Sequence, residues 1–129
     1  MNESREMYLK TINKLSGENG NVRCADIARS LNYSKPSISR AVRILGKEGY
    51  LYINHNGTVE LTETGRKIAL RVCEKQEILA LFFQKIAKVS KKRAELDACR
   101  IEHVISEEVF QGIKRFIEKE NVFFIDEVK

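Results

Sequence analysis

Residues 24–47 read CADIARSLNYSKPSISRAVRILGK, which is two helical patterns separated by a short break at Asn32-Tyr33. Apolar residues recur at three- and four-residue spacing in both patterns, so each helix is expected to bury one face. The expected buried residues are Ala25, Ile27, Ala28 and Leu31 in the first helix and Ile38, Ala41, Val42, Ile44 and Leu45 in the second. Ser34 can cap the second helix, Pro36 suits its first turn, and Gly49 is expected to end it. Two helices of this size joined by a tight turn predict a helix-turn-helix.

The second helix of this pair is basic. No acidic residue occurs between positions 34 and 47, whereas positive side chains stand at Lys35, Arg40, Arg43 and Lys47. A basic helix facing solvent suits a polyanion, and a helix-turn-helix lays its second helix in the major groove of DNA. On charge alone, an ordinary solvated helix face is the simpler interpretation.

A β-hairpin is predicted after the second helix. Aromatic and β-branched residues at 50–54 and 58–61 flank Asn56-Gly57, and both turn residues tolerate positive φ. The hairpin would form a wing. Because an amphipathic helix at 3–15 precedes the pair, residues 1–62 are expected to form a winged helix-turn-helix DNA-binding domain.

Helical patterns continue through the second half of the chain. Thr62 can cap a long helix that continues to about residue 86, Ser90 lies near the start of a helix that carries Cys99 and His103, and Ser106 can cap a last helix. The stretch 122–125 fits either a short strand or a packing segment. We therefore expect a mostly α fold with a small β-wing, in which residues 63–129 form a second, helical domain.

The composition excludes several classes of protein. Of the 129 residues, 43% are hydrophobic and 32% are charged, which is enough apolar material for a compact core and too much for a disordered tail. No apolar run reaches the roughly 20 residues that a membrane-spanning helix needs, and the N-terminus has no apolar signal core. We therefore expect a cytoplasmic protein without a membrane partner. Three widely separated cysteines favour reduced thiols.

Nothing in the sequence supports an enzyme. The two histidines, His55 and His103, lie far apart, and the chain has neither a phosphate-binding glycine loop nor a Ser/His/Asp set. We expect no catalysis and no small-molecule substrate.

A group of potential metal ligands occurs near residue 100. Cys99, Glu102 and His103 stand at positions i, i+3 and i+4 of a predicted helix, so sulfur, oxygen and nitrogen donors share one face. Such a donor set suits first-row divalent metals better than magnesium or calcium. On spacing alone, a buried cysteine, a surface glutamate and a half-buried histidine are the simpler interpretation.

Several longer motifs resemble the diphtheria toxin repressor family of metal-dependent transcriptional regulators. They cover nearly the whole chain: SREMYL at 4–9, SKPSIS at 34–39, LTETGR at 61–66 and DACRIEHVISEEV at 97–109. The winged-helix part is shared by many regulators, whereas Met7 together with the Cys-x-x-Glu-His run is highly specific. The chain resembles a short form, because its length leaves no room for the C-terminal SH3-like domain of the larger members.

The resemblance implies both a metal site and a DNA surface. The implied metal ligands are Met7, Cys99, Glu102 and His103, with iron(II) as the preferred ion and manganese(II), cobalt(II), nickel(II) or zinc(II) as alternatives. Base and thymine-methyl contacts are implied at Ser34, Pro36 and Arg40, and the forked donors of Arg40 can span two acceptors of guanine. We expect phosphate contacts from Lys35, Ser37, Ser39, Arg43 and Lys47.

The sequence also departs from the family. Gln76, Ala80 and Glu95 stand where iron-type members have His, Glu and His, so a second metal site would be mostly missing. Manganese-type members have acidic residues at the positions of Met7 and Lys10, and a paired manganese site is therefore not expected.

The favoured function is a homodimeric, metal-dependent repressor of metal-uptake genes. Metal would link the helix at 3–15 to a metal-binding and dimerisation domain and so favour binding to a palindromic double-stranded operator. The alternative is a metal-independent winged-helix regulator in which Cys99 is a redox sensor or a structural thiol. An interaction module that dimerises without DNA would need the basic helix to be incidental.

Overall fold

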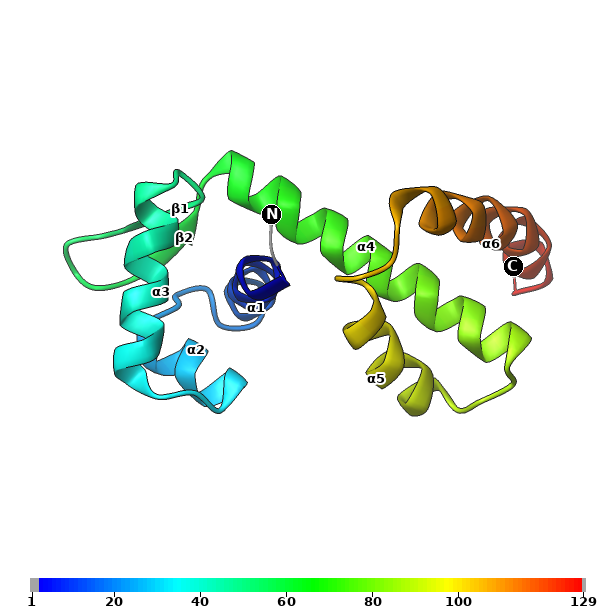
Figure 1. Cartoon of the computed structure of the whole chain (residues 1–129), viewed down its shortest axis with the longest axis horizontal. Coiled ribbons are helices and arrows are strands. Elements are labelled where there is room, and N and C mark those ends of the chain that lie inside the picture. Colours follow the sequence, from blue (N-terminus) through cyan, green and yellow to red (C-terminus); the bar gives the residue numbers. More distant parts are fainter. Residues whose placement is uncertain (1–2, 129) are drawn as a thin grey trace. The chain divides into compact units, whose positions relative to one another are not determined.

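The computed structural model describes residues 3–128, with side chains described for residues 3–120. The elements are α1 (Glu3–Asn19), α2 (Cys24–Leu31), α3 (Lys35–Lys47), β1 (Leu51–Ile53), β2 (Val59–Leu61), α4 (Glu63–Ile86), α5 (Lys91–Ile101) and α6 (Glu107–Val128) (Figure 1). The chain divides into two compact units, residues 1–71 and 72–129, and the division falls within α4. The expected fold class, mostly α with a small β-wing, is confirmed.

The predicted helix-turn-helix is formed by α2 and α3. Asn32 ends α2 in the left-handed conformation, with φ of 58°. Ser34 caps α3, because its side-chain oxygen accepts a hydrogen bond from the Ser37 N–H at 3.3 Å, and Pro36 lies in the first turn. Gly49, with φ of 87°, turns the chain away after α3, a conformation that costs little only for glycine.

Helix α1 is longer than the sequence pattern predicts. It passes through Gly17 and ends at Asn19, before Gly20, which has φ of 82°. The helix expected at 3–15 is therefore extended by four residues, through Gly17 and up to Gly20. A glycine inside a helix costs only about 1 kcal/mol, so neighbouring residues that pack well can hold it in the helix.

The core of the first unit lies where α1, α2, α3, the hairpin and the start of α4 meet. Its buried residues are Leu9, Ile12, Val22, Ile27, Ala28, Ile38, Val42, Leu45, Leu51, Val59 and Ala69. Ile44 was expected in this core, but its side chain is 45% exposed. The buried stripe of α3 follows Ile38, Val42 and Leu45, and the residue before Leu45 points about 100° away from that stripe.

The hairpin forms as predicted, with a different turn. β1 and β2 pair antiparallel in the register Leu51 with Leu61, Tyr52 with Glu60 and Ile53 with Val59. The Asn54 N–H donates to the Thr58 carbonyl at 2.8 Å, which leaves residues 55–57 as a three-residue turn. Gly57 takes a φ of 90°, whereas Asn56, which tolerates a positive φ, does not adopt one. Instead, the side-chain oxygen of Asn56 accepts hydrogen bonds from the Thr58 N–H and hydroxyl.

Thr62 and Gly65 attach the hairpin to the start of α4. The Thr62 hydroxyl donates to the Gly49 carbonyl at 2.7 Å and accepts from the Gly65 N–H at 3.2 Å, so it is the predicted cap. A Cβ atom built on Gly65 would overlap the Tyr50 carbonyl oxygen. The backbones therefore approach so closely at this point that only glycine fits.

The second unit packs the rest of α4 with α5 and α6. Its core contains Leu79, Ala80, Ala94, Ala98 and Phe110. Ser106 caps α6 by accepting from the Val109 N–H at 3.2 Å, as predicted. Ser90, expected only near the start of a helix, caps α5 by accepting from the Arg93 N–H at 3.1 Å. α6 continues through residues 122–125, so of the two interpretations left open for this stretch the strand is wrong.

Helix α5 ends earlier than expected. Its last residue is Ile101, Glu102 is the C-cap, and His103 and Val104 lie in the following turn. The N–H groups of Val104 and Ile105 both donate to the Ile101 carbonyl at 3.0 Å, which tightens the backbone into that turn before Ser106 starts α6. The expectation that Cys99, Glu102 and His103 share one helix is therefore wrong for His103.

Among the described residues, no helix is both long and apolar enough to span a membrane.

Candidate nucleic-acid interface and metal centre

The exposed face of α3 carries the residues that we expect to meet DNA. The side chains of Ser34, Lys35, Pro36, Ser37, Arg40, Arg43 and Lys47 are exposed, and that of Ser39 is half-buried. The hydroxyls of Ser34 and Ser37 lie 2.8 Å apart, at the start of the helix. Within the described part of the chain, no carboxylate pairs with the four cations Lys35, Arg40, Arg43 and Lys47. Their charge is therefore available to an external anion.

An ion pair connects α1 to the end of α3. Arg5 Nε donates to Glu48 Oε1 at 2.8 Å, and a second guanidinium nitrogen donates to Glu48 Oε2 at 2.9 Å. The hydrogen bonds and the negative charge of Glu48 raise the pKa of Arg5 above its ordinary value. Such a forked pair fixes direction as well as distance, so the first turn of α1 is held against the residue that follows α3.

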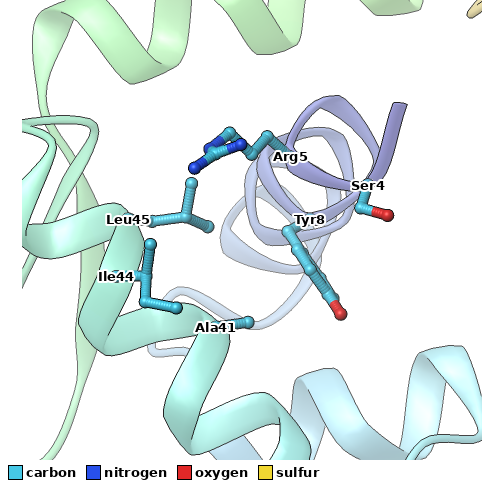
Figure 2. Close-up of a pocket in the computed structure, with 6 residues that line it drawn as sticks. All are labelled: Ser4, Arg5, Tyr8, Ala41, Ile44 and Leu45. Atoms are coloured by element: carbon cyan, nitrogen blue, oxygen red, sulfur yellow. The ribbon is translucent and has the colours of Figure 1, made fainter. Parts of the chain in front are cut away.

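A cavity of about 200 Å³ lies beside this ion pair. Figure 2 shows its lining residues, which come from the first turns of α1 and the second half of α3: Ser4, Arg5, Tyr8, Ala41, Ile44 and Leu45. The Tyr8 ring makes an edge-to-face contact with Tyr33, with the ring centroids 6.3 Å apart. Burial raises the pKa of Tyr8, and Tyr33 adds to the shift.

Sequence patterns gave no indication of the contact between α1 and α3. Arg5 and Glu48 are separated by 43 positions; Arg5 lies in α1 and Glu48 directly follows α3. No local periodicity relates two such residues, because their proximity depends on how α1 packs on the helix-turn-helix.

Two of the four expected metal ligands are in contact. The Glu102 carboxylate is buried, and its Oε1 lies 3.2 Å from His103 Nε2, whose side chain is 5% exposed. The Glu102 N–H still donates to the Ala98 carbonyl at 3.0 Å, so Glu102 keeps helical geometry one residue beyond α5. Cys99 is half-buried in the last turns of α5. Burial of an acid beside an imidazole is costly unless another group or a cation shares the charge.

The remaining expected ligand, Met7, belongs to the first unit, where its side chain is half-buried. Within the residues that the structure describes, no three His, Cys, Asp or Glu side chains are gathered closely enough to hold a metal ion. The donor types nevertheless fit a divalent transition metal, because a thioether, a thiolate, a carboxylate and an imidazole are available.

The positions that would hold a second metal ion are poorly suited to one. Ala80 is 5% exposed, lies in the core of the second unit, and has no ligand atom in its side chain. Gln84 donates its side-chain amide to the Ala80 carbonyl at 3.2 Å. Glu95 lies exposed on α5. Of the positions that the family resemblance implies for a second ion, Ala80 therefore offers no side-chain ligand.

Comparison with known proteins gives two matches to protein-family models, one in each half of the chain. The protein-family model described as "Iron dependent repressor, N-terminal DNA binding domain" matches residues 1–59, and the model described as "Iron dependent repressor, metal binding and dimerisation domain" matches residues 62–121. The chain belongs to the iron-dependent repressor family. The first match runs from α1 to the first residue of β2, and the second includes all of α4 and α5 and most of α6.

Individual iron-dependent repressors are similar over most of this chain. The iron-dependent repressor IdeR of Mycobacterium tuberculosis is 35% identical over 107 residues, which are 83% of this chain and 46% of that protein. An uncharacterised HTH-type transcriptional regulator of Methanocaldococcus jannaschii is 28% identical over 120 residues, 92% of this chain and 96% of that protein. The crystal structure of T. acidophilum IdeR superposes with a TM-score of 0.77 at 29% identity, covering 86% of this chain and 53% of that one. The chain thus spans about half the length of the named iron-dependent repressors that it matches.

Proposed function

We propose that this chain is a homodimeric transcriptional repressor that binds double-stranded DNA when it holds a divalent metal ion. The proposal depends on one observation above all: an α3 surface with four positive side chains lies in a family member that also matches the metal-binding and dimerisation model. Iron(II) is the ion we favour, because the relatives named above are iron-dependent and the donor set includes soft sulfur atoms. Its targets would be metal-uptake genes.

The proposed DNA contacts divide into two kinds. Arg40 reads guanine with its forked donors, while Ser34 and Pro36 meet base edges and thymine methyl groups at the start of α3. Lys35, Ser37, Ser39, Arg43 and Lys47 meet phosphates, which fixes the register of the helix without specifying sequence. A dimer would place two copies of α3 on the two halves of a palindromic operator.

The proposed metal ligands are Met7, Cys99, Glu102 and His103. A bound cation would supply a positive charge and a set of directed coordination bonds that satisfy the buried carboxylate and imidazole. Glu102 and His103 already lie together, so the second unit would present a partly prepared site. Met7 lies two residues from Arg5 on α1, and Arg5 is bonded to Glu48 at the end of α3. The four proposed ligands come from both units. A metal-loaded chain would therefore favour a restricted set of orientations of its DNA-binding unit.

The first experiment titrates DNA binding with metal. Fluorescence anisotropy of a duplex from the region upstream of the gene is measured with iron(II), without oxygen, and in parallel with manganese(II), cobalt(II), zinc(II) or a chelator. We expect tight binding with metal and at least about tenfold weaker binding with chelator, a ratio that corresponds to about 1.4 kcal/mol of coupling. Equal binding under both conditions would reject metal control. Sensitivity to peroxide and thiol reductant, without sensitivity to metal, would favour the redox alternative at Cys99.

The second experiment counts metal ions and tests the ligands. Metal analysis after anaerobic reconstitution should give one ion per chain, and Cys99→Ser, Glu102→Gln or Met7→Ala should reduce the metal affinity by about 10- to 100-fold or more. Cys24→Ser is the matched control, because Cys24 is a half-buried cysteine in the first turn of α2 in the other unit. Two ions per chain, or an equal loss in Cys24→Ser and Cys99→Ser, would contradict the proposed site.

A further inference from the structure

Arg23 directly precedes α2, and its side chain lies next to the hairpin turn. Its backbone is fixed on both sides: the Val59 N–H donates to the carbonyl of the preceding Val22 at 2.7 Å, and the Arg23 N–H donates to the Asp26 carboxylate at 2.9 Å. The Arg23 carbonyl accepts from the N–H of Asp26 at 2.9 Å. A cation at this position therefore starts from a rigid backbone although its side chain is exposed.

The guanidinium of Arg23 rests against the turn of the hairpin. A Cβ atom built on Gly57 would lie 2.7 Å from one guanidinium nitrogen and 3.9 Å from Cζ. The guanidinium can thus occupy this place only because residue 57 has no side chain. As a result, the positive charge stands beside the tip of the wing, formed by residues 54–58.

The surroundings leave this charge without an internal anion. Residues 54–58, NHNGT, contain no acid, and the nearby Glu60 carboxylate accepts a hydrogen bond from the Asn54 side chain at 2.7 Å. The Asp26 carboxylate accepts from the Arg23 backbone and pairs with the Arg29 guanidinium at 3.5 Å. Over the described residues, no carboxylate lies within ion-pair distance of the Arg23 guanidinium.

We infer that Arg23 is a further DNA contact, which holds a backbone phosphate beside the tip of the wing. This inference rests on the proposed function. A phosphodiester suits the site because a guanidinium can hold two phosphate oxygens with parallel N–H donors, and no carboxylate of the described residues pairs with this guanidinium. The contact would extend the DNA surface from α3 to the wing, and it would add affinity without reading sequence.

The test measures how DNA binding depends on salt. Each phosphate neutralised by a protein cation contributes about 0.9 to the slope of log affinity against log salt concentration. Binding of the metal-loaded protein to a mixed-sequence duplex is measured between about 50 and 200 mM salt. We expect Arg23→Gln to reduce the slope by about 0.9 for each Arg23 in the complex, and Arg23→Lys to keep the wild-type slope.

Arg29→Gln is the matched control, because Arg29 is an exposed arginine of α2, which Arg23 precedes, and its guanidinium pairs with Asp26. Its slope should equal that of the wild type. Should Arg23→Gln fail to fold, as judged by circular dichroism, Arg23→Met takes its place, since methionine keeps an unbranched apolar stem without the charge.

An unchanged slope in the Arg23 variant, or a change as large in the Arg29 variant, would overturn the inference while leaving the proposed function intact. A lower melting temperature with an unchanged slope would likewise overturn it and assign Arg23 to packing on the turn. If the wild-type protein itself shows no salt-dependent binding to duplex DNA, the proposed function fails and the inference fails with it.

Discussion

Arg5 and Glu48 form a two-point ion pair that joins the first turn of α1 to the residue after α3, with nitrogen–oxygen distances of 2.8 and 2.9 Å. The two side chains are 34% and 36% exposed, so water and salt partly screen the attraction. The pair therefore contributes more to the orientation of α1 than to the overall stability of the first unit.

A double-mutant cycle on this pair should show coupling. We expect Arg5→Ala and Glu48→Ala each to lower the Tm by no more than about 5 °C, because exposed ion pairs stabilise proteins only modestly. The double variant should be no less stable than the less stable of the two single variants. The coupling between Arg5 and Glu48 should shrink at high salt. Strictly additive losses measured by thermal unfolding would show that the two side chains act separately.

Two glycines in helices should respond in opposite ways to the same substitution. Gly65→Ala places a methyl group against the Tyr50 carbonyl, so the hairpin or the first turn of α4 must move, at a cost of about 1–3 kcal/mol or more. Gly17→Ala has no neighbour within 4 Å and should raise the free energy of unfolding by up to about 1 kcal/mol. Urea unfolding of both variants measures the difference, and a stable Gly65→Ala protein would contradict the close approach.

Substitutions at Ser34 should separate helix capping from DNA binding. Ser34→Ala removes the acceptor of the Ser37 N–H and should cost about 1 kcal/mol, whereas Ser34→Asp keeps an acceptor and should preserve stability. The aspartate adds negative charge to the proposed DNA face, so Ser34→Asp should still weaken DNA binding. Equal DNA affinity of Ser34→Asp and wild type in anisotropy measurements would remove Ser34 from that surface.

The core of the second unit depends on Phe110, which is 2% exposed and lies 5.5 Å below the Lys75 ammonium. Phe110→Ala should reduce the free energy of unfolding by about 3–5 kcal/mol, because it leaves a cavity that the neighbouring helices fill only partly. Val104→Ala, at a residue that is 70% exposed, should cost less than about 1 kcal/mol. The free energies of unfolding of both variants are measured at one protein concentration. Similar losses in the two variants would argue against a central place for Phe110 in this core.

Local chemistry in the sequence predicted the elements of the fold well. Ser34 and Ser106 cap the helices at which they were expected, and the turn at Gly57 joins two strands, because hydroxyl acceptors and glycine act over a few residues. Boundaries were less predictable, because tertiary packing decides them. Gly17 stays inside α1, and α5 ends at Ile101 although helical periodicity continues beyond it.

The candidate sites were predictable in part for a related reason. The exposed cations of α3 follow from helical spacing, so Lys35, Arg40, Arg43 and Lys47 could be placed on one solvent-facing surface before the structure was known. Ile44 could not be placed correctly, since the width of the buried stripe depends on how far α1 covers α3. The contacts of Arg5 with Glu48 and of Arg23 with Gly57 join distant segments, and no short-range pattern predicts them.

The attachment of the hairpin to α4 through Thr62 and Gly65 also guides protein engineering. A chimera that fuses the proposed DNA-binding unit to an unrelated sensor domain should cross over after the first turn of α4, so that the Thr62 cap and the Gly65 backbone contact stay with the hairpin. A crossover at residue 62 would place a foreign side chain against the Tyr50 carbonyl in most fusions. Position 65 is therefore the residue to inspect first when choosing a donor helix.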